Sequence, residues 1–293
     1  MKFSIIINKL ANFYFFVQNL SEWHFSNQKD YNVLWRKELE QFSMDEENAL
    51  KQFKEIRLQY KQSRTYFEQA FFVAENPWKS LEKNLPQNEY AAVQKIFNLL
   101  ENKFNLIYEK NLVLLNQWKE ILQEKINDPA LTESIADAIS TLLNTTPSKS
   151  EVKIYLLFSA PNHTGGGANI DDESISLEVS QYSLDGANHA MGIIWHETIH
   201  LCFQNQYFFP LVLKQFPDDR QKADLINEIT IGSLFPRGIL GVRLLKNKPA
   251  SRLMAKINSE QTIRVSNLTK EYISDQKSLD EKYIRAVAEI LKI

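Results

Sequence analysis

Hydrophobic residues recur at helical spacing through the first half of the chain. Between residues 43 and 74 the hydrophobic residues that lie near one helical face are Leu50, Phe53, Ile56, Tyr60, Tyr66 and Phe67. Pro77 ends this segment, and similar patterns at 87–124 and 128–144 predict two further helices. All eight glycines lie beyond residue 164, which agrees with a helical first half.

The first twenty residues are apolar, with polar interruptions at Asn8, Lys9 and Asn12. No small-residue cleavage site follows, so we interpret this segment as a helix of the mature protein rather than a signal peptide, with secretion as the minority alternative. No stretch reaches the roughly 20 uninterrupted apolar residues that cross a bilayer, so no membrane partner is expected.

The hydrophobic pattern changes after Pro147. Residues 152–160 are short, β-branched and aromatic, which predicts a buried strand, and the alternation in residues 174–180 predicts a half-buried, antiparallel strand. From Ala187 the helical pattern returns. The sequence therefore predicts a mainly α protein with a small β-sheet (α+β), divided into a helical region 1–147 and a second region 148–293.

The net charge and the cysteine content exclude several classes of function and of site. Thirty-four basic and thirty-six acidic side chains give a net charge of −2, which provides no positive field for nucleic acid. The single cysteine, Cys202, excludes an intrachain disulfide and a cysteine-based zinc cluster. A reducing, cytoplasmic location is the expectation.

Residues 196–200 read HETIH within an apolar helical run. His196 and His200 are four positions apart, so both imidazoles lie on one helical face and can bind one metal ion. Glu197 lies beside the first ligand, where its carboxylate can reach a zinc-bound water as a general base. The alternative is a local charge network without metal.

A catalytic zinc site needs a third protein ligand. Glu228 is the best candidate, because it lies in the apolar helical segment ADLINEITIGSL, where an unpaired carboxylate is costly. Asp218 and Asp219 follow Pro217 and are typical of a helix start, while Asp224 could be a partner one turn before Glu228. We expect one zinc ion per chain.

A glycine run separates the two predicted strands. Close approach of a substrate backbone is possible along the segment made of Gly165, Gly166, Gly167, Ala168 and Asn169. A flexible loop is the alternative for this run. The acids Asp171 and Asp172 beside it are interpreted as turn residues.

The order strand, glycine segment, strand, HExxH helix and glutamate helix resembles the gluzincin branch of the zinc metallopeptidases. The resemblance covers about residues 152–235 and implies a zincin-like core, with His196, His200 and Glu228 as zinc ligands and Glu197 as general base and proton shuttle. It also implies that residues 165–169 bind substrate.

The chain departs from the thermolysin-like and aminopeptidase-N-like families in two respects. The spacing from His200 to Glu228 is longer, and no histidine follows His200 to stabilise an oxyanion. Tyr272, Tyr283 or Arg237 could take that role.

The sequence thus predicts a zinc metallopeptidase whose partner is a peptide or protein substrate. The rival is an interaction or scaffold protein that has a zincin fold with a structural metal or none. A structural site needs a fourth protein ligand, for which His163, His189 and Cys202 are the candidates. We interpret His24 as structural, and Cys202 as a buried thiol because position i+2 points away from the histidine face.

Overall fold

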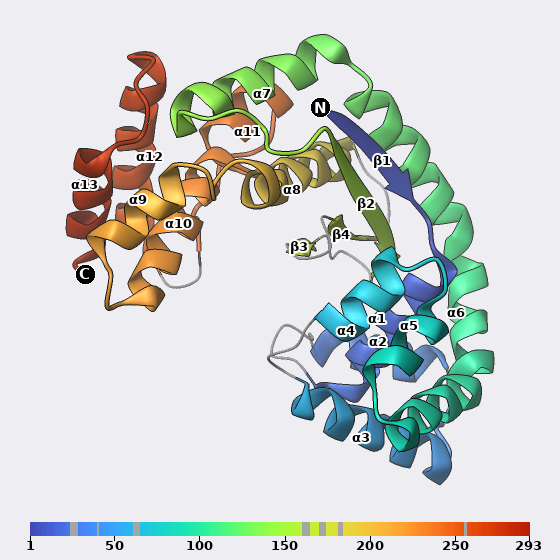
Figure 1. The fold of residues 1–293 in the computed structure, drawn as a ribbon. Coiled ribbons are helices and arrows are strands. Elements are labelled where there is room, and N and C mark those ends of the chain that lie inside the picture. The colour runs from blue at the N-terminus through green and yellow to red at the C-terminus, as the bar shows by residue number, and fades with distance from the viewer. Residues whose placement is uncertain are drawn as a thin grey trace.

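The computed structural model describes residues 1–23, 29–39, 41–60, 65–159, 165–169, 174–180, 184–254 and 257–293. Helices dominate this part of the chain, and one small mixed sheet lies among them (Figure 1). In chain order the elements are β1 (Lys2–Ile6), α1 (Lys9–Ser21), α2 (Lys29–Glu38), α3 (Met44–Gln59), α4 (Thr65–Glu68), the π-helix η1 (Gln69–Val73), α5 (Pro77–Asn84), α6 (Gln87–Ile126), α7 (Pro129–Leu143), β2 (Glu151–Phe158), β3 (Gly165–Asn169), β4 (Ser174–Val179), α8 (Leu184–Cys202), α9 (Phe208–Gln215), α10 (Arg220–Leu234), α11 (Ile239–Leu245), α12 (Ser259–Ser274) and α13 (Glu281–Leu291). The predicted α+β class with few strands is confirmed.

The strand order in the sheet is β1-β2-β4-β3. β2 pairs in parallel with β1 and β4, whereas β3 pairs antiparallel with β4. The prediction that residues 174–180 form an antiparallel strand is therefore correct only for the β3 side. Ile175, Leu177 and Val179 are buried, as their alternation predicts.

The first residues form a strand, so the prediction of a helix from the N-terminus is wrong there. Phe3 and Ile5 alternate with more exposed neighbours and are buried in the β1 strand. Helix α1 begins only after Asn8, whose side chain accepts hydrogen bonds from the backbone N–H groups of Leu10 and Ala11. The polar residue that interrupts the apolar run is thus the N-cap of the helix.

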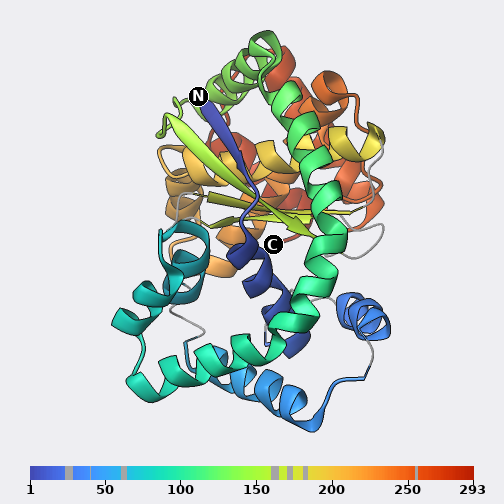
Figure 2. The same ribbon diagram turned by 90° about the vertical axis from the view of Figure 1, so that its right-hand side faces the viewer.

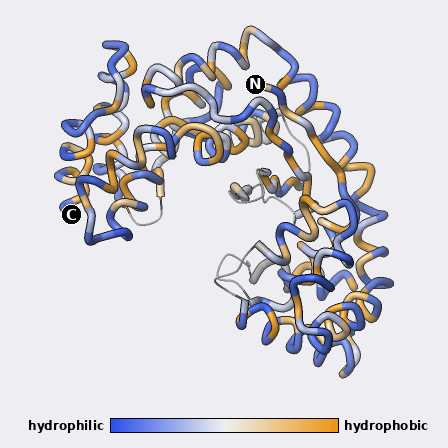
Figure 3. The backbone as a smooth tube through the Cα atoms, viewed as in Figure 1, coloured by the Kyte–Doolittle hydropathy of each residue, from blue (hydrophilic) through white to orange (hydrophobic). Residues whose placement is uncertain are grey.

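The long helix α6 runs from the group of helices that contains α3 and α5 to the beginning of α7 (Figures 1 and 2). It packs against α1, α3, β1, β2 and α8, and Figure 3 shows hydrophobic and hydrophilic residues alternating along it.

The predicted helix at 43–74 is divided into α3, α4 and η1. Arg57 of α3 is fully buried and pairs with Glu68 of α4 at 3.0 Å, which links these elements.

Helix α8 lies against the sheet and contacts β3, β4, α6, α10 and α11. The aromatic ring of Trp195 on α8 packs edge-on against Phe3 of β1, with ring centroids 5.3 Å apart. Strand β1 pairs with β2 in the same sheet, although the two segments are separated by almost 150 positions. Among the described residues, no helix combines the length and the apolar character that a bilayer crossing requires.

Candidate metal centre

Two helices supply the side chains of the candidate centre. α8 carries His196 and His200 one turn apart, so both rings leave the same face of the helix. α10 carries Glu228 and begins at the N-cap Asp219, whose side chain accepts from the backbone N–H of Lys222. The predicted role of Asp219 at a helix start is confirmed, and α10 packs directly against α8.

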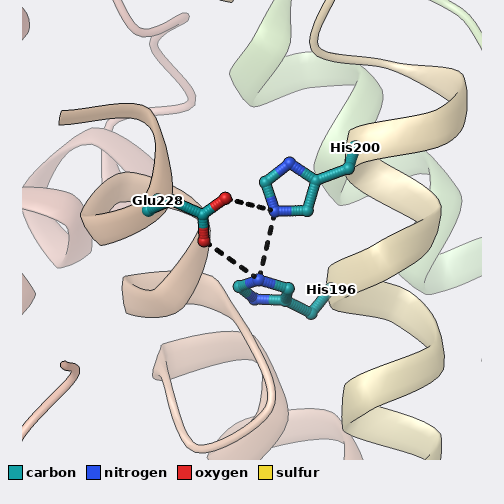
Figure 4. A group of neighbouring side chains, drawn as sticks. All are labelled: His196, His200 and Glu228. Carbon is teal, nitrogen blue, oxygen red and sulfur yellow. Dashed lines mark hydrogen bonds and ion pairs between the residues drawn. The ribbon is translucent and has the colours of Figure 1, made fainter. Parts of the chain in front are cut away.

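The three predicted ligands point toward one another (Figure 4). The Nε2 atoms of His196 and His200 are 3.1 Å apart. The carboxylate oxygens of Glu228 lie 3.3 Å from His200 Nε2 and 3.7 Å from His196 Nε2. One donor atom from each residue therefore falls within 4.8 Å of the others.

The opposite nitrogen of each imidazole binds a carbonyl-type oxygen. His196 Nδ1 lies 3.0 Å from the backbone oxygen of Phe235, and His200 Nδ1 lies 2.7 Å from Oε1 of Gln204. These acceptors require an N–H at each Nδ1, so each neutral ring presents an Nε2 lone pair to the shared centre. Gln204 Oε1 also accepts from Nδ2 of Asn227 at 2.6 Å, which ties the end of α8 to α10.

This donor set fits a cation. Two nitrogen lone pairs and a carboxylate face one point in a partly buried site, where they repel one another unless a proton or metal ion lies between them. The His200 side chain is 8% exposed, that of His196 16% and that of Glu228 43%. Two imidazoles and one carboxylate are ligands that zinc prefers, and hydrogen bonds to Nδ1 are usual for zinc-binding histidines.

The electrostatics of the centre favour a positive charge on His196 and a negative charge on Glu228, but not a second positive charge on His200. Burial disfavours protonation of His196, but the hydrogen bond to Glu228 and the charges of Glu197 and Glu228 outweigh it and raise its pKa above 6.5. Burial and the charge of His196 lower the pKa of His200. Burial opposes ionisation of Glu228, yet its interactions with both histidines lower its pKa below 4.5.

Glu197 lies between the two histidines in sequence and is intermediate in exposure. Its carboxylate is near enough to raise the pKa of both imidazoles electrostatically. It is not one of the three converging ligands. Its role as a general base stays a prediction.

The glycine segment forms a strand at the edge of the sheet rather than a loop. β3 packs against α8, and a Cβ atom at Gly166 would come within 2.6 Å of Ile193 Cγ2 and 3.0 Å of the Ser176 backbone oxygen. A Cβ atom at Gly167 would meet nothing within 4 Å. Gly166 is therefore required for packing, and the role of residues 165–169 in substrate binding stays a prediction.

Other acidic and thiol candidates take different roles. Asp224 accepts a hydrogen bond from Nε of Arg220 at 2.8 Å, so its carboxylate is engaged away from Glu228. Cys202 is buried and does not belong to the converging group. Asp218 is likewise outside that group.

The remaining histidines and acids divide between the described and undescribed parts of the chain. His189 lies on α8 but does not join the converging ligands, and its Nδ1 is buried without a hydrogen-bond partner. Burial and the charge of Arg237 lower its pKa from 6.5 to about 4. Four residues named in the sequence analysis lie outside the described residues: His24, His163, Asp171 and Asp172.

Two of the three residues considered for oxyanion stabilisation are engaged elsewhere. The hydroxyl of Tyr272 donates to Asp280 at 2.9 Å, and the buried hydroxyl of Tyr283 lies 2.8 Å from that of Thr269. Arg237 is exposed and follows the Phe235–Pro236 pair that contacts His196 and α8. Of the three, Arg237 is the one that directly follows the segment whose backbone contacts His196.

The residues that orient the imidazoles are not among the candidates predicted from the sequence. Gln204 is four positions after His200, a spacing that could have identified it. Asn227 precedes the predicted ligand Glu228 and shares its helix. The Phe235 backbone oxygen has no side-chain signature, so only the tertiary structure reveals it.

No protein-family model, curated protein or solved structure matches the chain.

Proposed function

We propose that the protein is a zinc-dependent hydrolase that cleaves peptide bonds, with one zinc ion per chain held by His196, His200 and Glu228. The observation that carries this proposal is the convergence of two Nε2 atoms and one carboxylate while both Nδ1 atoms bind acceptors. Three protein ligands also leave one coordination position open, as catalytic zinc sites require.

When bound in such a site, zinc lowers the pKa of a water molecule to about 7 and polarises a carbonyl group. Glu197 accepts a proton from the attacking water and returns it to the leaving amine. One C–O bond forms and the C–N bond of the amide breaks, so the products are a carboxylic acid and an amine. The partly exposed position of Glu197 beside the two histidines supports this assignment.

The arrangement around the centre supports a gluzincin-like, zincin-type core. A sheet with an antiparallel edge strand lies on the helix that carries HETIH, and the next long helix carries the glutamate ligand. Among the described residues, β3 pairs with β4 on one side and stands at the end of the sheet order, an arrangement in which an edge strand can pair with an extended peptide. We propose residues 165–169 as that peptide-binding strand.

Arg237 is the proposed stabiliser of the oxyanion that develops during attack on the carbonyl. Its backbone follows Pro236, which lies against α8 at Gly192, one turn before His196. The hydroxyls of Tyr272 and Tyr283 are bound within the C-terminal helices, which favours Arg237 over both.

A structural metal in an interaction or scaffold protein is the second candidate function. That role needs a fourth protein ligand, whereas the described ranges bring three ligand residues together. Substitution of His163, which lies outside those ranges, tests it directly: a structural site predicts loss of zinc in His163→Ala, and the hydrolase predicts retention.

Hydrolysis of a peptide library by the zinc-loaded protein tests the proposed function. We expect cleavage by the wild type, and a loss of about 10²- to 10⁴-fold in Glu197→Gln with zinc still bound. Glu124→Gln, at an exposed glutamate on α6, is the matched control and should cleave normally. Full activity of zinc-loaded Glu197→Gln would contradict the assigned base.

A further inference from the structure

Asn247 connects the metal-ligand helix to the loop that orients His196. It follows α11 and is 7% exposed. Its Nδ2 donates to the backbone oxygen of Asn188 on α8 at 3.0 Å and to the backbone oxygen of Pro236 at 2.8 Å. An amide NH₂ group has two donors, so both are used in this link.

The loop at Phe235 and Pro236 is held closely against α8. A Cβ atom at Gly192 would come within 2.7 Å of Pro236 Cβ and 2.9 Å of Asn247 Nδ2, so only a glycine fits between them. Gly192 lies one turn before His196 on the same helix. The helix, Asn247 and Pro236 therefore touch at this one point.

The adjacent residue, Phe235, is fully buried and its backbone oxygen accepts from His196 Nδ1. A closed path results: α8 binds Asn247, Asn247 binds Pro236, and Phe235 returns to α8 through His196. The position of the Phe235 oxygen relative to the imidazole is fixed by this path. That oxygen in turn keeps the proton on Nδ1 and leaves Nε2 free for a metal ion.

We infer that Asn247 is a positioning residue for the metal centre, holding the Phe235 oxygen where it orients His196 for metal binding. The inference rests on the proposed zinc site. Outer partners of metal-bound histidines change metal affinity by about 10- to 100-fold when they are removed. Asn247 acts on such a partner through one peptide unit, so a loss of about tenfold is expected.

Two substitutions disturb this path from opposite sides. Asn247→Asp is nearly isosteric but places an oxygen against two carbonyl oxygens, and Gly192→Ala pushes on Pro236 from the helix. Asn19→Asp is the matched control: Asn19 is also buried and donates to a backbone oxygen, that of Phe15, on α1. Helix α1 packs on α2, α3, α6, β2 and η1, and none of these elements carries a proposed zinc ligand.

Zinc affinity is measured by competition with a chelator, and the absorption spectrum is recorded with Co²⁺ in place of zinc. We expect Asn247→Asp and Gly192→Ala to lose about tenfold in zinc affinity and to alter the Co²⁺ bands, and Asn19→Asp to retain both. Asn247→Ser, whose hydroxyl cannot reach both carbonyl oxygens, replaces Asn247→Asp if that variant does not fold.

Wild-type affinity and spectrum in both folded loop variants would overturn the inference and leave the proposed zinc site intact. Equal loss in Asn19→Asp would also overturn it, because the effect would then be general destabilisation. Failure of the wild type to bind zinc would instead contradict the proposed function itself.

Discussion

The hydrogen bonds of the ring nitrogens of His196 and His200 determine what the centre can bind. Each Nδ1 donates to an oxygen, of Phe235 and Gln204 respectively, and each Nε2 is left as an acceptor. With Glu228 opposite, the site attracts a cation whether that cation is a proton or a metal ion. If the proposed zinc ion binds there, it must compete with protons for the same lone pairs.

This competition predicts how zinc affinity depends on pH. The pKa of His196 is raised above 6.5 and that of His200 is lowered, so one proton must leave the folded protein before zinc binds. Below the raised pKa, affinity should increase about tenfold per pH unit, and above it the curve should level off. Chelator competition between pH 5 and 9 measures this, and a flat curve through pH 6.5 would contradict it.

His189 makes a separate contribution to stability. Burial and Arg237 lower its pKa from 6.5 to about 4, so the unfolded chain binds this proton more tightly. The contribution of His189 to the free energy of unfolding should therefore be fully present above pH 6.5 and be lost as the pH falls from 6.5 toward 4. Allowing for its partial exposure, the loss is on the order of 1 to 2 kcal/mol.

Urea unfolding of wild type and His189→Gln at pH 7 and pH 4.5 tests the prediction. The variant should lose less stability between the two pH values than the wild type, because the other titrating groups are shared. Equal losses of stability in the two proteins would show that protonation of His189 does not cause the predicted loss at low pH.

At the scale of elements, the close packing of β3 on α8 places the sheet edge beside the helix that carries the two proposed histidine ligands. Within the glycine segment, Gly166 faces Ile193 of α8 and the backbone of β4, where a Cβ atom would be too close to both. Its neighbour Gly167 faces open space. Two adjacent glycines thus have different structural requirements.

Substituting alanine at these two positions separates packing from chain flexibility. Gly166→Ala should lower the free energy of unfolding by about 1 to 3 kcal/mol through overpacking. Gly167→Ala reduces unfolded-chain entropy without a contact and should be neutral within about 0.5 kcal/mol or slightly stabilising. Denaturant unfolding of both variants measures this; equal destabilisation would contradict the difference between the sites.

The sequence predicts those parts of the fold and site that depend on local spacing. The HETIH spacing places both histidines on one helical face. The apolar neighbours of Glu228 single out its carboxylate as the third member of the converging group. The apolar pattern does not separate the strand at residues 2–6 from helix α1, because only Ile7 lies between the strand and the helix cap at Asn8. The parallel pairing of β2 and β4 and the Phe235 oxygen depend on long-range contacts that periodicity does not encode.

For the whole molecule, the centre joins α8, which supports the sheet, to α10, which packs on the C-terminal helices α12 and α13. An ion bound between them stabilises the folded state alone. Zinc at 100 times its Kd should raise the free energy of unfolding by about 2.7 kcal/mol. Denaturant unfolding with and without zinc measures this, and His200→Ala, which removes a ligand, should show no increase. The same increase in His200→Ala would place the bound zinc elsewhere.

Zinc content per chain is the most direct test of the central claim. Tag-free protein, dialysed without chelator, is analysed for metal beside His196→Ala and Glu228→Gln. The account predicts about one zinc per wild-type chain and a loss in both variants. No zinc in the wild type after zinc is added back, or equal zinc in all three proteins, would contradict it.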